Sequence, residues 1–240
     1  SMPAFARPKS VVATPLDEEP LEDGTDETFT STLEVVDETV EQPTDEPKGK
    51  QVGVNIDGIP EFREFLPTQL GAAADLGSMH EAAVRQAITG LADAITQYEG
   101  PVSAARFASL TAKSFGLSSV KSEKAAAINS IPPTAKFARD AEGFIYPSGV
   151  KPNDFQDWKR QEIGTGRDIG DISLIEIANA MHDLCQLTHG LNNDDLFRQT
   201  NLAFGRSRIG STVSARLEQA LALALKLGIL AKDDDQFVSA

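Results

Sequence analysis

Two stretches of this 240-residue chain carry basic residues and no acidic ones, although the chain as a whole is acidic. Residues 101–122 hold three cations, and residues 196–217 hold four. Phosphate groups attract cations, and nearby carboxylates weaken that attraction. The two windows therefore predict contacts with nucleic acid, although the same cations could instead contact a protein or cover apolar surface with their stems. The candidate residues are Arg106, Lys113, Lys121, Arg198, Arg206, Arg208 and Arg216.

The stretch Trp158-Lys159-Arg160 places the only tryptophan beside two cations. Such a group can stack on a base and hold the adjacent phosphate. A lone tryptophan in a polar connector more often packs into a joint between domains, and we expect that position here. The nearby glycine-rich run 164–170 has no preceding apolar strand and no Gly-Lys-Ser/Thr ending, so it does not match a phosphate-binding loop.

The remaining reactive side chains form no catalytic or metal-binding pattern. His182 and His189 lie seven residues apart without a third ligand, and His80 is far from both in the sequence. Cys185, the only cysteine, follows Met181 by four residues, which suits a buried thiol better than a nucleophile. A single cysteine also favours a reducing compartment. We expect no enzyme activity, cofactor or metal in this chain itself, no membrane association, and a cytoplasmic location.

Helical periodicity marks the elements that must position these cations. Residues 84–98 carry apolar side chains at steps of three and four, and Gly100-Pro101 ends that helix. A second helix is expected over 103–113 and a third over 119–128. An extended hairpin is expected over 136–146, after two prolines that stop the third helix.

The same order recurs in the second half of the chain, and this repeat is the most informative feature of the sequence. Ser173 and Glu176 form a capping box at the start of a helix that Gly190 ends. Asn192 or Asn193 caps the next helix, which ends at a Phe-Gly pair as the second helix of the first half does. The three helices and the hairpin of this half are expected over 173–189, 192–202, 213–227 and 229–238.

Helix, helix, turn, helix and two-stranded wing is the order of a winged helix. The sequence therefore predicts a mostly α fold with small β-hairpins (α+β), built as tandem winged-helix repeats and preceded by a disordered acidic segment. In such a repeat the third helix enters a major groove and the second crosses the phosphate backbone. Both acid-free windows cover the second helix, the turn and the third helix.

Residues 1–50 differ in composition from the rest of the chain. They hold 4 of the 22 basic residues but 13 of the 36 acidic ones, together with six of the 13 prolines. Such a segment buries too little apolar surface to offset its conformational entropy. The expected domains are a disordered acidic linker at 1–50, a packed strap at 51–78, winged-helix units at 79–148 and 172–240, and a connector at 149–171.

Several short blocks, in order, resemble a known family across about residues 84–240. The blocks are 98–102 (Tyr-Glu-Gly-Pro-Val), 115–117 (Phe-Gly-Leu), 143–147 (Gly-Phe-Ile-Tyr-Pro), 158–160, 167–181 and 206–210. They resemble the C-terminal domain of unknown function of large bacterial superfamily-one helicases that also carry a very-short-patch-repair-like nuclease domain. Tyr146 departs from the Trp-Pro that the family pattern leads us to expect, which affects only packing of the wing.

The resemblance implies a context rather than a reaction. It implies a non-catalytic C-terminal accessory module whose ATPase and nuclease domains lie upstream, with residues 1–50 as the linker to them. The expected partners are nucleic acid, specifically DNA, and those upstream helicase and nuclease domains. The alternative is a protein-interaction or autoregulatory module that docks on the upstream ATPase core.

Overall fold

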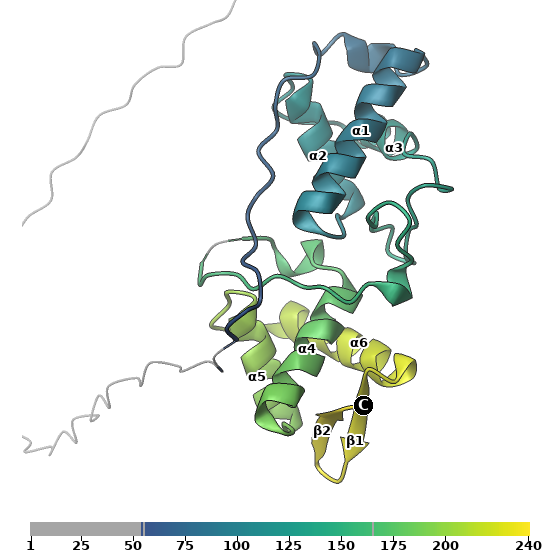
Figure 1. The fold of residues 1–240 in the computed structure, drawn as a ribbon. Helices are drawn as coiled ribbons and strands as arrows, with labels where there is room; N and C mark the ends of the chain where they lie inside the picture. The colour runs from purple at the N-terminus through teal and green to yellow at the C-terminus, as the bar shows by residue number, and fades with distance from the viewer. Residues whose placement is uncertain (1–53, 55, 165) are drawn as a thin grey trace, which may run out of the picture. The chain divides into compact units, whose positions relative to one another are not determined.

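Helices dominate the part of the chain that the computed structural model describes, which is residues 54, 56–164 and 166–240 (Figure 1). These residues contain six α-helices and one two-stranded antiparallel sheet. The expected mostly α, α+β class is therefore confirmed. The expected disorder of residues 1–50 lies outside the described residues. Three short 3₁₀ helices are η1 (Asp75–Gly77), η2 (Pro152–Asp154) and η3 (Ile169–Asp171).

Three helices form the first half, residues 79–148. They are α1 (Ala82–Glu99), α2 (Ala104–Ser114) and α3 (Ser122–Asn129). The α1 helix ends at Gly100, whose φ of 93° favours glycine. The hydroxyl of Ser103 caps α2 by accepting from the backbone N–H of Arg106 at 3.1 Å. In contrast, α3 begins three residues later than expected, and Lys121 precedes it without a side-chain cap.

Three further helices form the second half, residues 172–240. They are α4 (Leu174–Thr188), α5 (Asn193–Ala203) and α6 (Ser211–Leu227). The predicted capping box of Ser173 and Glu176 is present at the start of α4. Asn192, the first of the two expected caps, accepts from the backbone N–H of Asp195 at 2.9 Å. Local hydrogen bonds thus fix the starts of α4 and α5 where the sequence predicts them.

A short hairpin follows α6 and pairs with the chain between α4 and α5. Its strands are β1 (Leu230–Asp233) and β2 (Gln236–Ser239), which run antiparallel with Leu230 opposite Ser239. Leu191 and Phe237 exchange backbone hydrogen bonds of 3.1 and 2.8 Å. In the first half, Val102 lies between α1 and α2 and exchanges bonds of 3.0 and 2.9 Å with Ile145. In both halves, therefore, the segment between the first and second helices pairs with the second limb of the hairpin that follows the third helix.

The first-half hairpin expected over 136–146 is less regular than the sequence predicts. Only an isolated bridge between Arg139 and Ile145 joins its two limbs, and the described residues of this segment form no named strand. The carboxylate of Asp140 accepts from the backbone N–H groups of Glu142 and Phe144, at 3.0 and 2.9 Å. This local turn occupies N–H groups that a regular ladder would use.

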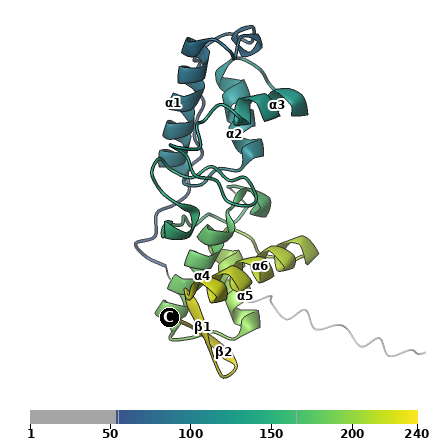
Figure 2. The same cartoon turned by 90° about the vertical axis from the view of Figure 1, so that its right-hand side faces the viewer.

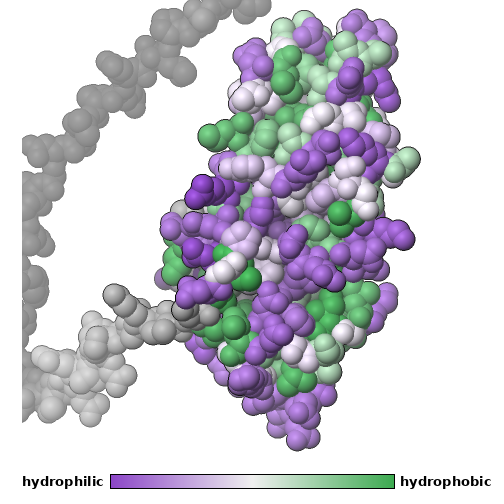
Figure 3. Space-filling view, viewed as in Figure 1, coloured by the Kyte–Doolittle hydropathy of each residue, from purple (hydrophilic) through white to green (hydrophobic). Residues whose placement is uncertain are grey.

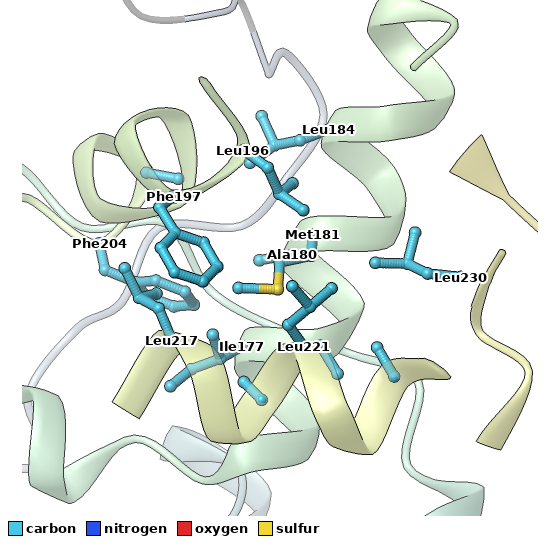
Figure 4. Close-up of a cluster of buried hydrophobic side chains, with 14 of the residues drawn as sticks. Ile177, Ala180, Met181, Leu184, Leu196, Phe197, Phe204, Leu217, Leu221 and Leu230 are labelled. Atoms are coloured by element: carbon cyan, nitrogen blue, oxygen red, sulfur yellow. The ribbon is translucent and has the colours of Figure 1, made fainter. Parts of the chain in front are cut away.

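Each half has its own hydrophobic core, and the two groups of helices are distinct in both ribbon views (Figures 1 and 2). Figure 4 shows the second-half core, where side chains of α4, α5 and α6 meet. Members of this core include Ile177, Met181, Leu184, Leu196, Phe197, Phe204, Leu217 and Leu221. A third cluster joins Phe144 and Tyr146 of the first half to Phe155 and Ile175, so the halves are packed against each other.

The segment 56–78, most of the expected strap, lies against both halves. The backbone N–H of Phe62 in this segment donates to the carbonyl of Arg160 in the connector at 2.8 Å. Farther along, the N–H of Leu70 donates to the carbonyl of Ser114 at 2.8 Å. Just before the segment, the N–H of Val54 donates to the side chain of Gln199 on α5 at 2.9 Å. One extended stretch thereby connects α5 with α2.

Candidate nucleic-acid interface

Arg106, the first candidate, is half-buried on α2 and forms an ion pair with Glu99 at the end of α1. Its Nε and Nη2 donate to the two carboxylate oxygens at 2.6 and 2.7 Å. Glu64 adds a longer contact of 3.5 Å. The hydrogen bonds to Glu99, above all, raise the pKa of Arg106. The guanidinium therefore holds α1 and α2 together, and it would have to leave this carboxylate to contact a phosphate.

Arg216 is also engaged inside the molecule, although it lies on α6 in the second acid-free window. Its Nη1 pairs with the carboxylate of Glu142 from the first-half hairpin. Its Nη2 donates to the backbone carbonyl of Ile172 at 2.6 Å. The side chain is 11% exposed. Arg216 thus connects the two halves.

Two further arginines of the second window, Arg198 within α5 and Arg206 after it, differ in exposure. Arg206 follows α5 and donates to the carbonyl of Arg167 at 3.0 Å, with Asp168 at 3.5 Å. Arg198 is exposed on α5 and pairs with Asp195 at 2.6 Å. Exposed pairs of this kind are weak and are readily exchanged for another anion. Arg198 therefore remains able to contact a phosphate, whereas Arg206 holds the connector in place.

Within the two acid-free windows, three cations are exposed, and their side chains form no ion pair or hydrogen bond with other residues in the described part of the chain. They are Lys113, Lys121 and Arg208. Lys113 lies at the end of α2, and Lys121 lies just before α3. Arg208 lies in the turn between α5 and α6. The structure thus brings the open cations to the turns that precede the third helix of each half.

A groove lies beside Lys121, between that turn, α3 and the segment before α1. We refer to it as the α3 groove, with a volume of about 600 Å³. Its principal lining residues are Met79, Leu117, Val120, Ala127, Lys121 and Lys124. Glu123 is the acidic residue of this lining. The α3 groove thus combines apolar walls with two lysines.

The corresponding groove of the second half, between α5 and α6, carries more negative charge. Asp194 and Glu218 line it, and Arg198 is its cation. The tip of the β1–β2 hairpin adds the exposed residues 233–235, all aspartates. Positive charge that is open to a phosphate is therefore greater on the first half than on the second.

Trp158 is buried, with 2% of its surface exposed, and packs in the second-half core. Its ring meets that of Phe204 edge to face with centroids 5.6 Å apart, and its Nε1 donates to Asp183 at 2.8 Å. Neither ring face is available to a base in this position. The neighbouring Lys159 Nζ donates to the carbonyl of Tyr98 on α1, and burial lowers the pKa of Lys159. The structure thus favours a packed position for Trp158 over stacking of its ring on a base.

Arg160 is exposed, but its backbone is engaged in the joint. It exchanges hydrogen bonds with the strap, accepting from Phe62 at 2.8 Å and donating to Pro60 at 3.0 Å. Its position in the connector is between the two halves, outside both turns that precede a third helix. Arg160 is therefore not grouped with Lys113 and Lys121.

The sequence reasoning missed the acids that reach the candidate arginines from outside the two windows. Glu99 lies two residues before the first window, and this closeness was a usable signal. Glu142 lies 74 residues from Arg216. No local pattern connects that pair, because it depends on how the two halves pack.

Elsewhere, the described residues include possible metal ligands, one cysteine and apolar side chains. Among them, no group of three or more His, Cys, Asp or Glu side chains is arranged to hold a metal ion. Cys185 lies in the second-half core, as predicted, and burial raises its pKa to about 11. None of the described helices has the length and apolar character needed to cross a membrane. On the face drawn in Figure 3, hydrophobic groups are small and separated by hydrophilic residues.

No protein-family model matches the chain, and neither a curated protein nor a solved structure matches it significantly.

Proposed function

We propose that both halves of the chain are winged helices and that together they form a non-catalytic module that contacts nucleic acid, most readily DNA. The observation that carries this proposal is the repeated pairing between the first interhelical segment and the returning limb of the hairpin. Val102 pairs with Ile145 in one half, and Leu191 pairs with Phe237 in the other. In a winged helix, the segment between the first two helices likewise pairs with the two-stranded wing, and the wing lies beside the third helix.

The turns before the third helices repeat as well. Phe115 and Phe204 end the second helices and are both buried. Gly116 and Gly205 follow them with φ values of 78° and 71°. These left-handed residues redirect the chain toward the third helix. The shared turn supports the tandem repeat independently of the hairpins.

Within this pair, the first unit is the better candidate for phosphate contact. Lys113 and Lys121 flank its turn without a carboxylate partner among the described residues, and Lys124 follows on α3. Backbone N–H groups at the start of α3 add positive potential. Arg208 and Arg198 supply weaker contacts from the second unit, whose wing tip is acidic.

The second candidate function is docking on a protein, and the acidic wing tip of the second unit favours it. Residues 233–235 repel a phosphate backbone but attract a basic protein surface. In the helicase context that the sequence resembles, such a surface belongs to the upstream ATPase core. The module then uses one unit for nucleic acid and the other for its own protein.

A titration separates these two functions. The full chain is titrated with duplex, forked and single-stranded DNA at two salt concentrations. The double reversal Lys113→Glu with Lys121→Glu is expected to abolish binding at moderate salt. Its matched control, Lys151→Glu with Lys226→Glu, reverses two exposed lysines elsewhere and is expected to retain most of the binding. Absence of binding to all three ligands at low salt would sink the nucleic-acid proposal and leave docking.

A further inference from the structure

Tyr98 is the only aromatic residue in the described part of the chain whose side chain is exposed, and 47% of its surface is open to solvent. It lies in the last turn of α1, where the strap passes. The ring of Phe65 meets it edge to face, with centroids 6.0 Å apart. The backbone N–H of Phe65 also donates to Glu99 Oε1 at 2.7 Å, so the strap is held against this end of α1. The Tyr98 ring therefore has a fixed position although about half of its surface is uncovered.

Two cations lie close to this ring. Lys159 Nζ lies 6.0 Å from the ring centre and donates to the backbone carbonyl of Tyr98. Arg63 precedes Phe65 by two residues, which places its Cα within about 7 Å of that of Phe65. Arg63 is exposed, and its side chain forms no ion pair or hydrogen bond with other residues that the structure describes. The arrangement of an aromatic ring beside two cations, expected at 158–160, is thus found with Tyr98 as the exposed ring.

Acidic residues near these cations limit what charge alone can contribute. They are Glu61, Glu64 and Asp157. A ligand that offers only phosphates would therefore gain little here, whereas one that also places a base on the Tyr98 ring would gain stacking. Leu66, which follows Phe65 and is 78% exposed, adds apolar surface beside the ring.

We propose that Tyr98 stacks on an unpaired base and that Arg63 holds the adjacent phosphate, so that this part of the strap binds single-stranded DNA. The faces of bases in a duplex are covered by neighbouring base pairs, whereas those of a single strand are open to an aromatic ring. This inference rests on the proposed nucleic-acid function and names the form of the ligand. The site uses none of the cations of the two acid-free windows, so it can be tested separately from them.

Photocrosslinking of the full chain tests the contact directly. The probe is an oligothymidylate of about ten nucleotides, within the ~4–16 nucleotides that single-strand sites cover, and it carries one 5-iodouracil. Irradiation of the complex, followed by mass spectrometry of its peptides, is expected to identify Tyr98 as the principal crosslinked residue. Crosslinks confined to residues outside the strap and the end of α1 would overturn the proposal.

Substitutions of Tyr98 test the stacking, with fluorescence anisotropy of the same oligonucleotide as the measurement. Tyr98→Phe keeps the ring and should retain binding. Tyr98→Leu keeps an apolar side chain but removes the stacking surface, and it should weaken binding by roughly 5- to 140-fold. Circular dichroism confirms that both variants are folded. Equal binding by the two variants would contradict stacking.

Substitution of Arg63 tests the phosphate contact. Arg63→Gln should weaken binding of the oligonucleotide and reduce the slope of log K against log salt concentration by about 0.7. The matched control is Lys226→Gln, which removes the charge of an exposed lysine on α6 and should leave both the affinity and the slope unchanged. The same slope in the two variants would remove Arg63 from the site.

Parallel titrations with duplex DNA separate this inference from the proposed function. If Lys113→Glu with Lys121→Glu abolishes duplex binding while Tyr98→Leu leaves single-strand binding unchanged, the proposed function stands and the Tyr98 site fails. If Tyr98→Leu weakens single-strand binding while the double reversal leaves duplex binding unchanged, the Tyr98 site stands and the role assigned to the turns fails. Absence of binding to both ligands at low salt would overturn both.

Discussion

Arg167 and Glu176 form a two-point ion pair in which both side chains are 1% exposed. The two contacts measure 3.0 and 3.2 Å. The Cζ atom of Arg167 lies 4.4 Å from the centre of the Phe62 ring. The Cζ atom of Arg106 lies 5.8 Å from the centre of the same ring. Since Arg106 pairs with Glu99, one ion pair from each half meets at a single aromatic ring of the strap.

Arg167→Met is expected to destabilise the protein by about 3–5 kcal/mol, because it leaves the buried carboxylate of Glu176 without its cation. Urea unfolding followed by circular dichroism measures the change. The control is Arg198→Met, which breaks the exposed pair with Asp195 and should leave the free energy of unfolding close to that of the parent protein. Equal effects of the two substitutions would contradict the structural role assigned to Arg167.

Trp158→Ala is expected to cost about 3–5 kcal/mol, since it removes a buried aromatic side chain from the second-half core and leaves a cavity. Because Trp158 is the only tryptophan, its fluorescence reports on the same site. The folded parent should emit at short wavelength and resist iodide quenching. An exposed spectrum, together with an unchanged unfolding midpoint in the variant, would show that the joint is not packed in solution.

Arg206→Ala and Arg208→Ala are expected to differ in stability although they are two residues apart. Arg206 donates to the carbonyl of Arg167, and a lost hydrogen bond to a charged group costs about 1.5–3 kcal/mol. Arg208 is exposed, so its removal should stay within about 0.5 kcal/mol. Thermal unfolding of both variants measures the difference. A larger loss of stability in Arg208→Ala than in Arg206→Ala would refute the structural role of Arg206.

The protein is expected to lose stability as the pH rises from about 9 toward 11. Burial holds the pKa of Cys185 at about 11, above its value in an unfolded chain, and burial also raises the pKa of Tyr146. In this range the unfolded chain releases protons that the folded chain retains, so stability falls with pH. Urea midpoints at several pH values should decline less steeply in Cys185→Ala. An identical decline would rule out the thiol as a contributor.

The parts of the fold that the sequence predicts best are those fixed by neighbours in the chain. Ser173 and Glu176 are three residues apart, and Asn192 caps a helix that begins one residue later, so their geometry is determined locally. The irregular limbs around Asp140 could not be predicted, since the carboxylate there replaces part of a ladder that hydrophobic alternation favours.

The candidate site shows the limit of composition-based reasoning more clearly. A window free of acids identifies cations without local partners, but Arg216 obtains Glu142 from 74 residues away and Arg206 obtains Asp168 from 38. Such pairs form only after segments that are distant in the sequence have packed together. Lys113 and Lys121 remain open because the acids recruited by this packing reach other cations.

The hydrogen bond between the Val54 N–H and the Gln199 side chain joins residues that are 145 positions apart. On a ribosome that adds about 5–20 residues per second, the partner of Val54 appears roughly 7–30 seconds later. The first half can therefore emerge and fold while the start of the strap still has no surface to lie on. The start of the strap can bind α5 only after Gln199 has been synthesised.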